Sequence, residues 1–332
     1  ASGKEENSAW TYVDGDKYAR PDRFGTLVFT APPSTPATLV RREIKADRYE
    51  PVIVPQPTSV QWATGVFRPT TRTRLRIADA SQRPEAEVLQ ADLQSRYGLR
   101  VPIVEGKARR TVGTIDLAAE IDASVPAGDE AYSVRVTAQG VQVAARTPRA
   151  RLYGVETIRQ MLADDAQGPF LRCGTINDAP AMQWRGWHMT GPLAADLPAY
   201  KQMVDLLALL KFNTIIWEVN GRLQYETHPD IAATGSPTKA QLRELVEYAR
   251  SRHFEVIPQF ASFSHFEFVL GRPGYASLAE SQQTVKGFRS RYNYCPSNPA
   301  VYPLVFDLMG ELTDVFQPRY FHIGHDESSF DD

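Results

Sequence analysis

The feature that most constrains the fold is a regular alternation of short apolar segments and amphipathic segments, which begins near residue 178. Buried strands and helices with one apolar face produce this alternation. Repeated strand–helix units form a parallel sheet, and several of them in succession favour a (β/α)8 TIM barrel of the α/β class. A doubly wound sheet is the alternative, although no Gly-x-Gly-x-x-Gly turn follows the first strand. The expected strands are 184–189, 213–217, 254–258 and 319–324, and the expected helices are 198–210, one capped by Thr238 and Gln241, and one opening at Asn298 and Pro299.

A smaller α/β domain is expected before the barrel, over residues 51–175. Residues 85–97 place apolar side chains on one helical face, and Gly98 follows them as a typical helix stop. Residues 132–145 alternate apolar and polar positions on both sides of a central turn, which predicts a hairpin. Apolar residues at helical spacing over 152–162 then predict a helix that covers one face of the sheet.

The first 50 residues show no sustained pattern. Pro32 and Pro33 interrupt a candidate hairpin made of residues 25–30 and 39–44. We interpret this part as an N-terminal extension or the tail of an upstream β module rather than as a binding site. The expected domains are therefore residues 1–50, 51–175 and 176–332.

Composition excludes several classes of protein. The chain has 37 basic and 39 acidic residues, a net charge of −2, and 42% hydrophobic residues, which argues against long disorder and against a nucleic-acid partner. No apolar run approaches the roughly 18 residues of a membrane span, so no membrane partner is expected. The two cysteines, Cys173 and Cys295, cannot build a disulfide framework. The small, polar N-terminus could be what remains after a leader is cleaved, or the point where a longer sequence was cut. We expect an exported protein, extracellular or periplasmic.

The sharpest motif is His322-Ile323-Gly324-His325-Asp326-Glu327, where the fourth expected strand ends. In a barrel, the carboxyl ends of the strands form the catalytic face. Two adjacent carboxyl groups there tend to share one proton, and an acid beside a carboxylate suits cleavage of a glycosidic bond. Solvated loop charges are one alternative. A metal site is another, but neighbouring side chains on an extended backbone point to opposite faces, so no metal and no cofactor are expected.

At this point the sequence resembles a known family. His-x-Gly-x-Asp-Glu after an apolar strand is similar to the hallmark of the family-20 glycoside hydrolases, the β-N-acetylhexosaminidases. Trp184-Arg185-Gly186 resembles the family's first barrel strand. The resemblance covers about residues 51–332 and looks closest to the hexosaminidase D-like branch. Further stretches that carry it are 151–158, 257–270 and 294–299.

The resemblance implies an exo-acting enzyme that removes terminal GlcNAc or GalNAc from glycans that end in an N-acetylhexosamine. The implied mechanism is retaining and substrate-assisted, an exception among glycosidases because the substrate's own acetamido oxygen is the nucleophile. By the match, Glu327 is the general acid and Asp326 stabilises the acetamido group. Arg185 would grip sugar hydroxyls, with a structural ion pair as the alternative. His265 would lie close to the acid, and Glu218 would line the pocket.

The chain also departs from the family's pattern. After the first strand it reads Trp187-His188-Met189, and after the second Trp217-Glu218-Val219, where many members carry other polar residues. These loops shape the sugar site, so the preferred sugar stays open. Two other functions remain as alternatives: a non-catalytic carbohydrate-binding protein on the same fold, and a barrel hydrolase acting on a non-amino sugar.

Length sets a final constraint. Residues 183–332 number 150, whereas a whole barrel takes about 250. Four strand candidates are half of eight, and an open half-barrel would expose an apolar edge. We therefore expect the first half of a barrel, completed by a C-terminal remainder or by a second chain. Taken alone, this chain is expected to carry the acid and its partner but not a working pocket.

Overall fold

The computed structural model describes residues 19–21, 27–29, 46–106, 113–123, 125–281 and 291–327. The chain divides into two units, Ala1–Glu43 and Ile44–Asp332. In the first unit, β1 (Ala19–Pro21) pairs with β2 (Leu27–Phe29) in antiparallel fashion. The strand expected at 25–30 thus forms, but its partner is β1, and the expected strand 39–44 lies outside the described residues.

One mixed sheet is the framework of residues 59–178. Its strand order is β3-β10-β7-β8-β6-β4-β5, with β9 paired to β10. The first four strands of this order are antiparallel neighbours, and the last four are parallel. The strands are β3 (Ser59–Phe67), β4 (Arg74–Ile77), β5 (Ile103–Glu105), β6 (Thr114–Asp116), β7 (Tyr132–Thr137), β8 (Gly140–Ala145), β9 (Ala163–Asp165) and β10 (Gly168–Asp178).

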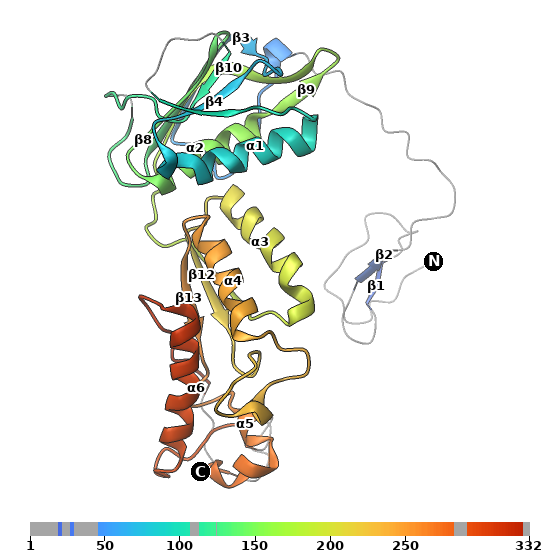
Figure 1. Cartoon of the computed structure of the whole chain (residues 1–332), viewed down its shortest axis with the longest axis vertical. Helices are drawn as coiled ribbons and strands as arrows, with labels where there is room; N and C mark the ends of the chain where they lie inside the picture. The colour runs from blue at the N-terminus through green and yellow to red at the C-terminus, as the bar shows by residue number, and fades with distance from the viewer. Residues whose placement is uncertain are drawn as a thin grey trace, which may run out of the picture. The chain divides into compact units, whose positions relative to one another are not determined.

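Two neighbouring helices, α1 (Arg83–Tyr97) and α2 (Pro148–Met161), cover one face of this sheet (Figure 1). The predicted helices and the hairpin of β7 and β8 are confirmed, and α1 ends at Gly98 with a left-handed φ of 67°. In α2, Gly154 permits a close approach, since a Cβ there would lie 2.5 Å from a methyl carbon of Val143. The helix therefore packs directly on the hairpin.

The second sheet contains β11 (Gly186–Thr190), β12 (Thr214–Glu218) and β13 (Glu255–Gln259), all parallel. Helices follow each strand, and their apolar faces share a core with the alternate strand residues Ile215, Trp217 and Val256. The Thr238–Gln241 capping box forms as predicted at the start of α4. The helix expected from Asn298 begins later, at Val301, because the Asn298 side chain accepts a hydrogen bond from the backbone N–H of Ala300 in a turn. The helices beside this sheet are α3 (Leu197–Leu209), α4 (Lys239–Arg250), α5 (Glu267–Leu270) and α6 (Val301–Phe316). The 3-10 turns of the whole unit Ile44–Asp332 are Ala46–Arg48, Ala80–Gln82, Ala194–Asp196, Pro229–Ile231 and Pro273–Leu278.

The fourth expected strand, 319–324, does not form as a regular strand. A single parallel bridge joins His322 to Gln259 of β13. His322 N–H donates to the Pro258 carbonyl at 2.9 Å, and the Phe260 N–H donates to the His322 carbonyl at 3.0 Å. Gly324 then turns the backbone into the left-handed region, which ends the extended segment after one bridge. The segment nevertheless takes the fourth parallel position of the sheet.

The sheet curls strongly. In a flat sheet, the first and fourth positions would be three steps of about 4.8 Å apart, roughly 14 Å. The rings of His188 in β11 and His322 are only 6.4 Å apart between centroids, and those of Trp184 and Tyr320 are 5.4 Å apart. Side chains of the outer positions therefore meet across one face, as barrel curvature requires.

Charged side chains of the smaller domain hold the amino ends of the three barrel strands. Each strand has at least one such contact just before its first residues, so the smaller domain holds the amino end of the sheet and leaves the carboxyl end uncovered. The contacts join Glu130 to Arg185 before β11 (2.7 Å), Asp178 to Lys211 before β12 (3.7 Å), and Glu85 to His253 before β13 (2.6 Å).

Within the described part of the chain, no helix is long and apolar enough to cross a membrane.

Candidate active site

The carboxyl end of the barrel sheet brings two neighbouring carboxylates together with a histidine. Asp326 and Glu327 follow the bridged fourth segment, and His265 lies in the loop after β13. His265 Nε2 is 3.4 Å from Glu327 Oε2 and 3.7 Å from Asp326 Oδ2. The structure thus gathers three of the five predicted site residues, with one imidazole facing both carboxylates.

Tyr292 belongs to the same cluster, although no sequence motif singled it out. Its hydroxyl lies 2.8 Å from Nε2 and 2.9 Å from Nδ1 of His265. Burial, together with the negative charges of Glu327, Glu267 and Asp326, raises the pKa of Tyr292 to about 12. The hydroxyl therefore keeps its proton at neutral pH and can donate to the imidazole. The available signal was its place just before the resembled stretch 294–299.

Two buried serines after β13 hold the backbone of the motif. The Ser264 hydroxyl donates to the carbonyl oxygen of Asp326, and Ser262 donates through its N–H and its hydroxyl to the carbonyl of Ile323. The Ser262 hydroxyl also lies 2.8 Å from His325 Nε2. Residues 262–265 form bends rather than a strand, so tertiary contacts, and not a local sequence pattern, give the two serines this role.

Gly324 is required by its surroundings. Its φ is 58°, and a Cβ there would lie 2.9 Å from both the carbonyl oxygen of Phe260 and the Cα of Ala261. Any larger residue would push the motif away from the chain that follows β13. The glycine of the motif therefore sets the distance between the carboxylates and the His265 loop.

Glu218 lies at the same end of the sheet, as its place in the sequence predicts, because it is the last residue of β12. Its Oε1 accepts a hydrogen bond of 2.7 Å from Asn220 Nδ2, and Asn220 Oδ1 accepts one of 2.8 Å from the Ala261 N–H. His188 Nε2 is 3.7 Å from Glu218 Oε2. The carboxylate is thus held in a fixed direction by the loop after β13.

Arg185, predicted to grip sugar hydroxyls, does not lie among these residues in the described part of the chain. It lies before β11, at the amino end of the sheet, opposite to the catalytic end. Its guanidinium pairs with Glu130 at 2.7 Å and donates to the Tyr153 hydroxyl at 2.7 Å and the Lys211 carbonyl at 2.8 Å. These contacts match the structural ion pair that the sequence left open as the alternative to sugar binding.

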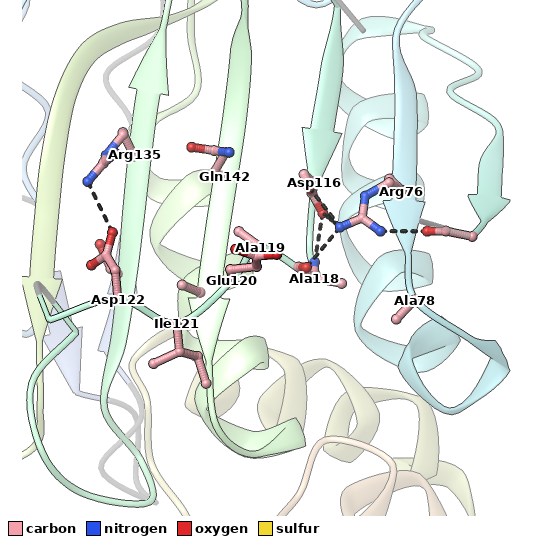
Figure 2. Close-up of a pocket in the computed structure, with 13 residues that line it drawn as sticks. Arg76, Ala78, Asp116, Ala118, Ala119, Glu120, Ile121, Asp122, Arg135 and Gln142 are labelled. Carbon is pink, nitrogen blue, oxygen red and sulfur yellow. Dashed lines mark hydrogen bonds and ion pairs between the residues drawn. The ribbon is translucent and has the colours of Figure 1, made fainter. Parts of the chain in front are cut away.

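A separate pocket of about 880 Å³ lies on the helix-free face of the smaller domain's sheet (Figure 2). Figure 2 shows its two arginines beside acidic partners: Arg76 bonds Asp116 at 2.7 Å, and Arg135 lies 3.6 Å from Asp122. The lining has these two arginines and three acidic residues, Asp116, Glu120 and Asp122, but no histidine beside paired carboxylates like the cluster around His265. Among the described residues, no group of three or more His, Cys, Asp or Glu side chains is arranged so that it could hold a metal ion.

Two models of one protein family match most of the chain. Residues 50–179 match "Glycosyl hydrolase family 20, domain 2", and residues 183–332 match "Glycosyl hydrolase family 20, catalytic domain". A β-hexosaminidase of Akkermansia muciniphila is 29% identical over 226 residues, which are 60% of this chain and 45% of that protein. One of Porphyromonas gingivalis is 24% identical over 304 residues, 83% of this chain and 38% of that protein. The chain thus spans less than half the length of these relatives.

Solved structures are similar as well. The Streptomyces plicatus N-acetyl-β-hexosaminidase in complex with Thio-NAglucal has a TM-score of 0.66 and 26% identity, covering 86% of this chain and 60% of that one. The family 20 β-N-acetylhexosaminidase of Streptomyces coelicolor has a TM-score of 0.65 and 27% identity, covering 85% and 60%. The second sheet is therefore the first half of a (β/α)8 TIM barrel, and a smaller α/β domain precedes it. Two domains of one family account for most of the sequence, and the chain belongs to glycosyl hydrolase family 20.

Proposed function

We propose that this chain carries the acid–base machinery of an exo-β-N-acetylhexosaminidase, a glycoside hydrolase that removes terminal GlcNAc or GalNAc. The observation that carries the proposal is the pair Asp326 and Glu327 at the fourth barrel position, both within 3.7 Å of His265. Relatives named β-hexosaminidase support it, and a solved mutant of the Streptomyces plicatus enzyme holds the product GlcNAc.

The proposed reaction is retaining and substrate-assisted. The acetamido oxygen of the substrate attacks the anomeric carbon as the glycosidic bond breaks, and Glu327 gives its proton to the leaving oxygen. Asp326 accepts a hydrogen bond from the acetamido N–H. It also stabilises the positive charge that develops on the ring closed by this attack. Glu327 then takes a proton from water, which attacks the anomeric carbon and reopens that ring. Two adjacent carboxyl groups suit these roles, because one donates while the other stays anionic.

His265 and Glu218 support this chemistry in different ways. His265 lies close enough to Glu327 to orient the acid, and Tyr292 orients His265 in turn. Glu218 lines the sugar site from β12. For Arg185 we propose the structural role, since its guanidinium pairs with Glu130 of the smaller domain.

The working site would need further barrel strands, supplied by a C-terminal remainder or by a second chain. We also propose that the boundary between the smaller domain and the barrel lies close to residue 176, with residues 1–50 as a separate extension.

The test uses the full-length natural protein and an aryl N-acetyl-β-glucosaminide, with the corresponding galactosaminide and a plain glucoside for comparison. We expect turnover of at least one N-acetyl sugar, no turnover of the glucoside, and tight inhibition by a thiazoline that mimics the cyclised acetamido intermediate. Turnover of the glucoside without thiazoline inhibition would indicate a hydrolase for non-amino sugars. Sugar binding without any turnover would indicate a non-catalytic binding protein.

A further inference from the structure

A second polar set lies near the carboxyl end of the barrel sheet, on the face opposite to the helices. Strand residues in register share a face. Glu218 is aligned with Gln259, and Gln259 is bridged to His322. His188 lies on the same face two residues before the end of β11. Trp217, which precedes Glu218 in β12, is buried in the core that the sheet shares with the helices. Glu218 and the residues aligned with it therefore point to the opposite face.

The members of this set converge although they come from four strand positions. The rings of His188 and His322 lie 6.4 Å apart between centroids and are nearly parallel, at 23°. His188 Nε2 is 3.7 Å from Glu218 Oε2. The curl of the sheet therefore gathers two imidazoles and a carboxylate into one place, close in sequence and in sheet position to Asp326 and Glu327.

The hydrogen-bonding capacity of this set is directed outward. The Gly324 N–H donates to His322 Nδ1 at 3.2 Å, so in the neutral ring the proton lies on Nε2, which is then a donor. Glu218 keeps Oε2 as an acceptor, because only Oε1 is engaged by Asn220. Gln259 is only 5% exposed, and its Oε1 accepts no hydrogen bond from the described residues. A buried amide oxygen without a donor is costly, so this one points to a ligand that supplies a donor.

We propose that His188, Glu218, Gln259 and His322 form a hydroxyl-binding set for the terminal sugar, with His188 as the residue that decides which ring hydroxyls are accepted. The inference rests on the proposed function and adds to it the groups that select the sugar. Alcohols both donate and accept, and this set offers a carboxylate, an amide oxygen and imidazole N–H groups. A phosphate or carboxylate ligand is disfavoured, since Glu218 would repel it.

The test compares the full-length natural protein with its His188→Ala variant. The substrates are an aryl N-acetyl-β-glucosaminide and its 3-, 4- and 6-deoxy analogues. We expect the variant to lose about tenfold in kcat/KM on the parent sugar, the size of one hydrogen bond, and to lose nothing on the analogue that lacks the contacted hydroxyl. An equal loss on every substrate would show a merely structural role, and no loss on any would remove His188 from the site. Either result overturns the inference.

A matched control is His228→Ala. The His228 ring lies 3.2 Å from the Tyr275 hydroxyl and 3.2 Å from Asp307 of α6, in the helical layer. We expect this variant to keep the wild-type kcat/KM on all four substrates.

The inference and the proposed function fail in different ways. If the wild type hydrolyses the substrates and His188→Ala keeps the same relative kcat/KM on all four of them, the inference alone is overturned. If the wild type hydrolyses nothing, calorimetric binding of N-acetylglucosamine and its deoxy analogues becomes the readout. Binding that His188→Ala weakens only for sugars bearing one particular hydroxyl would support the inference without the enzyme. Equal binding by both proteins, or no binding by the wild type, would overturn it.

Discussion

At the residue scale, the site depends on backbone conformations that most side chains avoid. His265 has a φ of 53° and Glu327 a φ of 52°, and their side chains face each other. Residues other than glycine adopt this left-handed region only when their surroundings enforce it, and such residues gather at functional sites. Here the bonds from Ser262 and Ser264 to the motif supply that enforcement.

Gly324 offers a test of how tightly the motif is placed. We expect Gly324→Ala to cost about 2–3 kcal/mol of unfolding free energy, from both the left-handed φ and the close contacts of the new Cβ. Gly235→Ala is the control, because Gly235 has a φ of 80° but nothing within 4 Å of a Cβ, and it should cost only about 1 kcal/mol. Denaturant unfolding measures both. Equal costs would mean that the close approach at Gly324 is unimportant.

The position of the carboxylates could be predicted from the sequence, whereas the contacts of Arg185 could not. Asp326 and Glu327 follow an expected strand, and residues that follow a parallel strand lie at the carboxyl end of the sheet. Arg185 precedes its strand, and the short pattern Trp184-Arg185-Gly186 does not show towards which end of the strand the side chain extends. The residues that the sequence did not single out, Tyr292 and the two serines, act through tertiary contacts that no local pattern encodes.

At the element scale, strands with apolar residues and flanking helices were predictable, because their periodicity follows from burial on one face. β12 and β13 lie within one residue of the expected ranges, and β11 begins two residues later. The fourth segment is different: its apolar sequence predicts a strand, but Gly324 redirects the backbone after a single bridge to β13. The bridge to β13 and the turn at Gly324, rather than the strand propensity of the segment, decide its conformation.

Helix α6 contributes a test through Glu311, which joins it to the loop after β12. Burial raises the pKa of Glu311, but bonds from Lys239, Thr227 and the backbone of Glu226 outweigh it and lower the pKa to about 2. A lowered carboxyl pKa stabilises the fold above its unfolded value of 4.5, and this stabilisation is lost as the pH falls towards 2. We expect Glu311→Gln to lose on the order of 2 kcal/mol at pH 7, measured by denaturant unfolding, and less at pH 3.

The control for Glu311 is Glu244→Gln. Glu244 pairs with Lys201 at 2.6 Å on the surface, with 70% of its side chain exposed. Exposed pairs contribute little, so this variant should change stability by less than about 1 kcal/mol. A similar loss in both variants would mean that the buried network around Glu311 has no special weight.

Helix α2 gives a pH effect of the opposite sign. Glu156 is fully buried, and burial raises its pKa to about 7 despite its bond to Arg159 at 2.7 Å. The folded state then binds the proton more tightly than the unfolded chain. Stability is highest below about pH 4.5 for this group and is lost as the pH rises to about 7.

The corresponding variant is Glu156→Gln, which cannot ionise. We expect its stability relative to the wild type to improve by on the order of 2 kcal/mol between pH 4.5 and pH 8. Denaturant unfolding across this range gives the difference. A wild-type curve parallel to that of the variant would contradict the raised pKa.

At the scale of the whole molecule, the two ends of the barrel sheet have different tasks. The amino ends of the strands are held by charged groups of the smaller domain, and the carboxyl ends carry Asp326, Glu327 and the set around His188. This separation leaves the carboxyl end free for the proposed substrate. The charged residues of the smaller domain that hold these strands lie far from them in the sequence. No local pattern could therefore predict the contacts.

The proposed need for further strands gives a test of its own. Expressed by itself, the stretch 1–332 should show no turnover of an aryl N-acetylhexosaminide and should self-associate in light scattering, because unpaired strand edges recruit other strands. The full-length natural protein, measured alongside, should be active and free of this association. Full activity of the short stretch as a monomer would contradict the half-barrel account.

The most direct test of the central claim is the rate of Glu327→Gln in the full-length protein on N-acetyl sugars with alkyl leaving groups, which need protonation. We predict a fall in kcat of about 10²–10⁴-fold, the usual contribution of a general acid, with wild-type stability retained. Activated aryl substrates, which leave without help, should lose much less. Unchanged turnover of the alkyl substrates would contradict the assignment of Glu327 as the acid and, with it, the proposed mechanism.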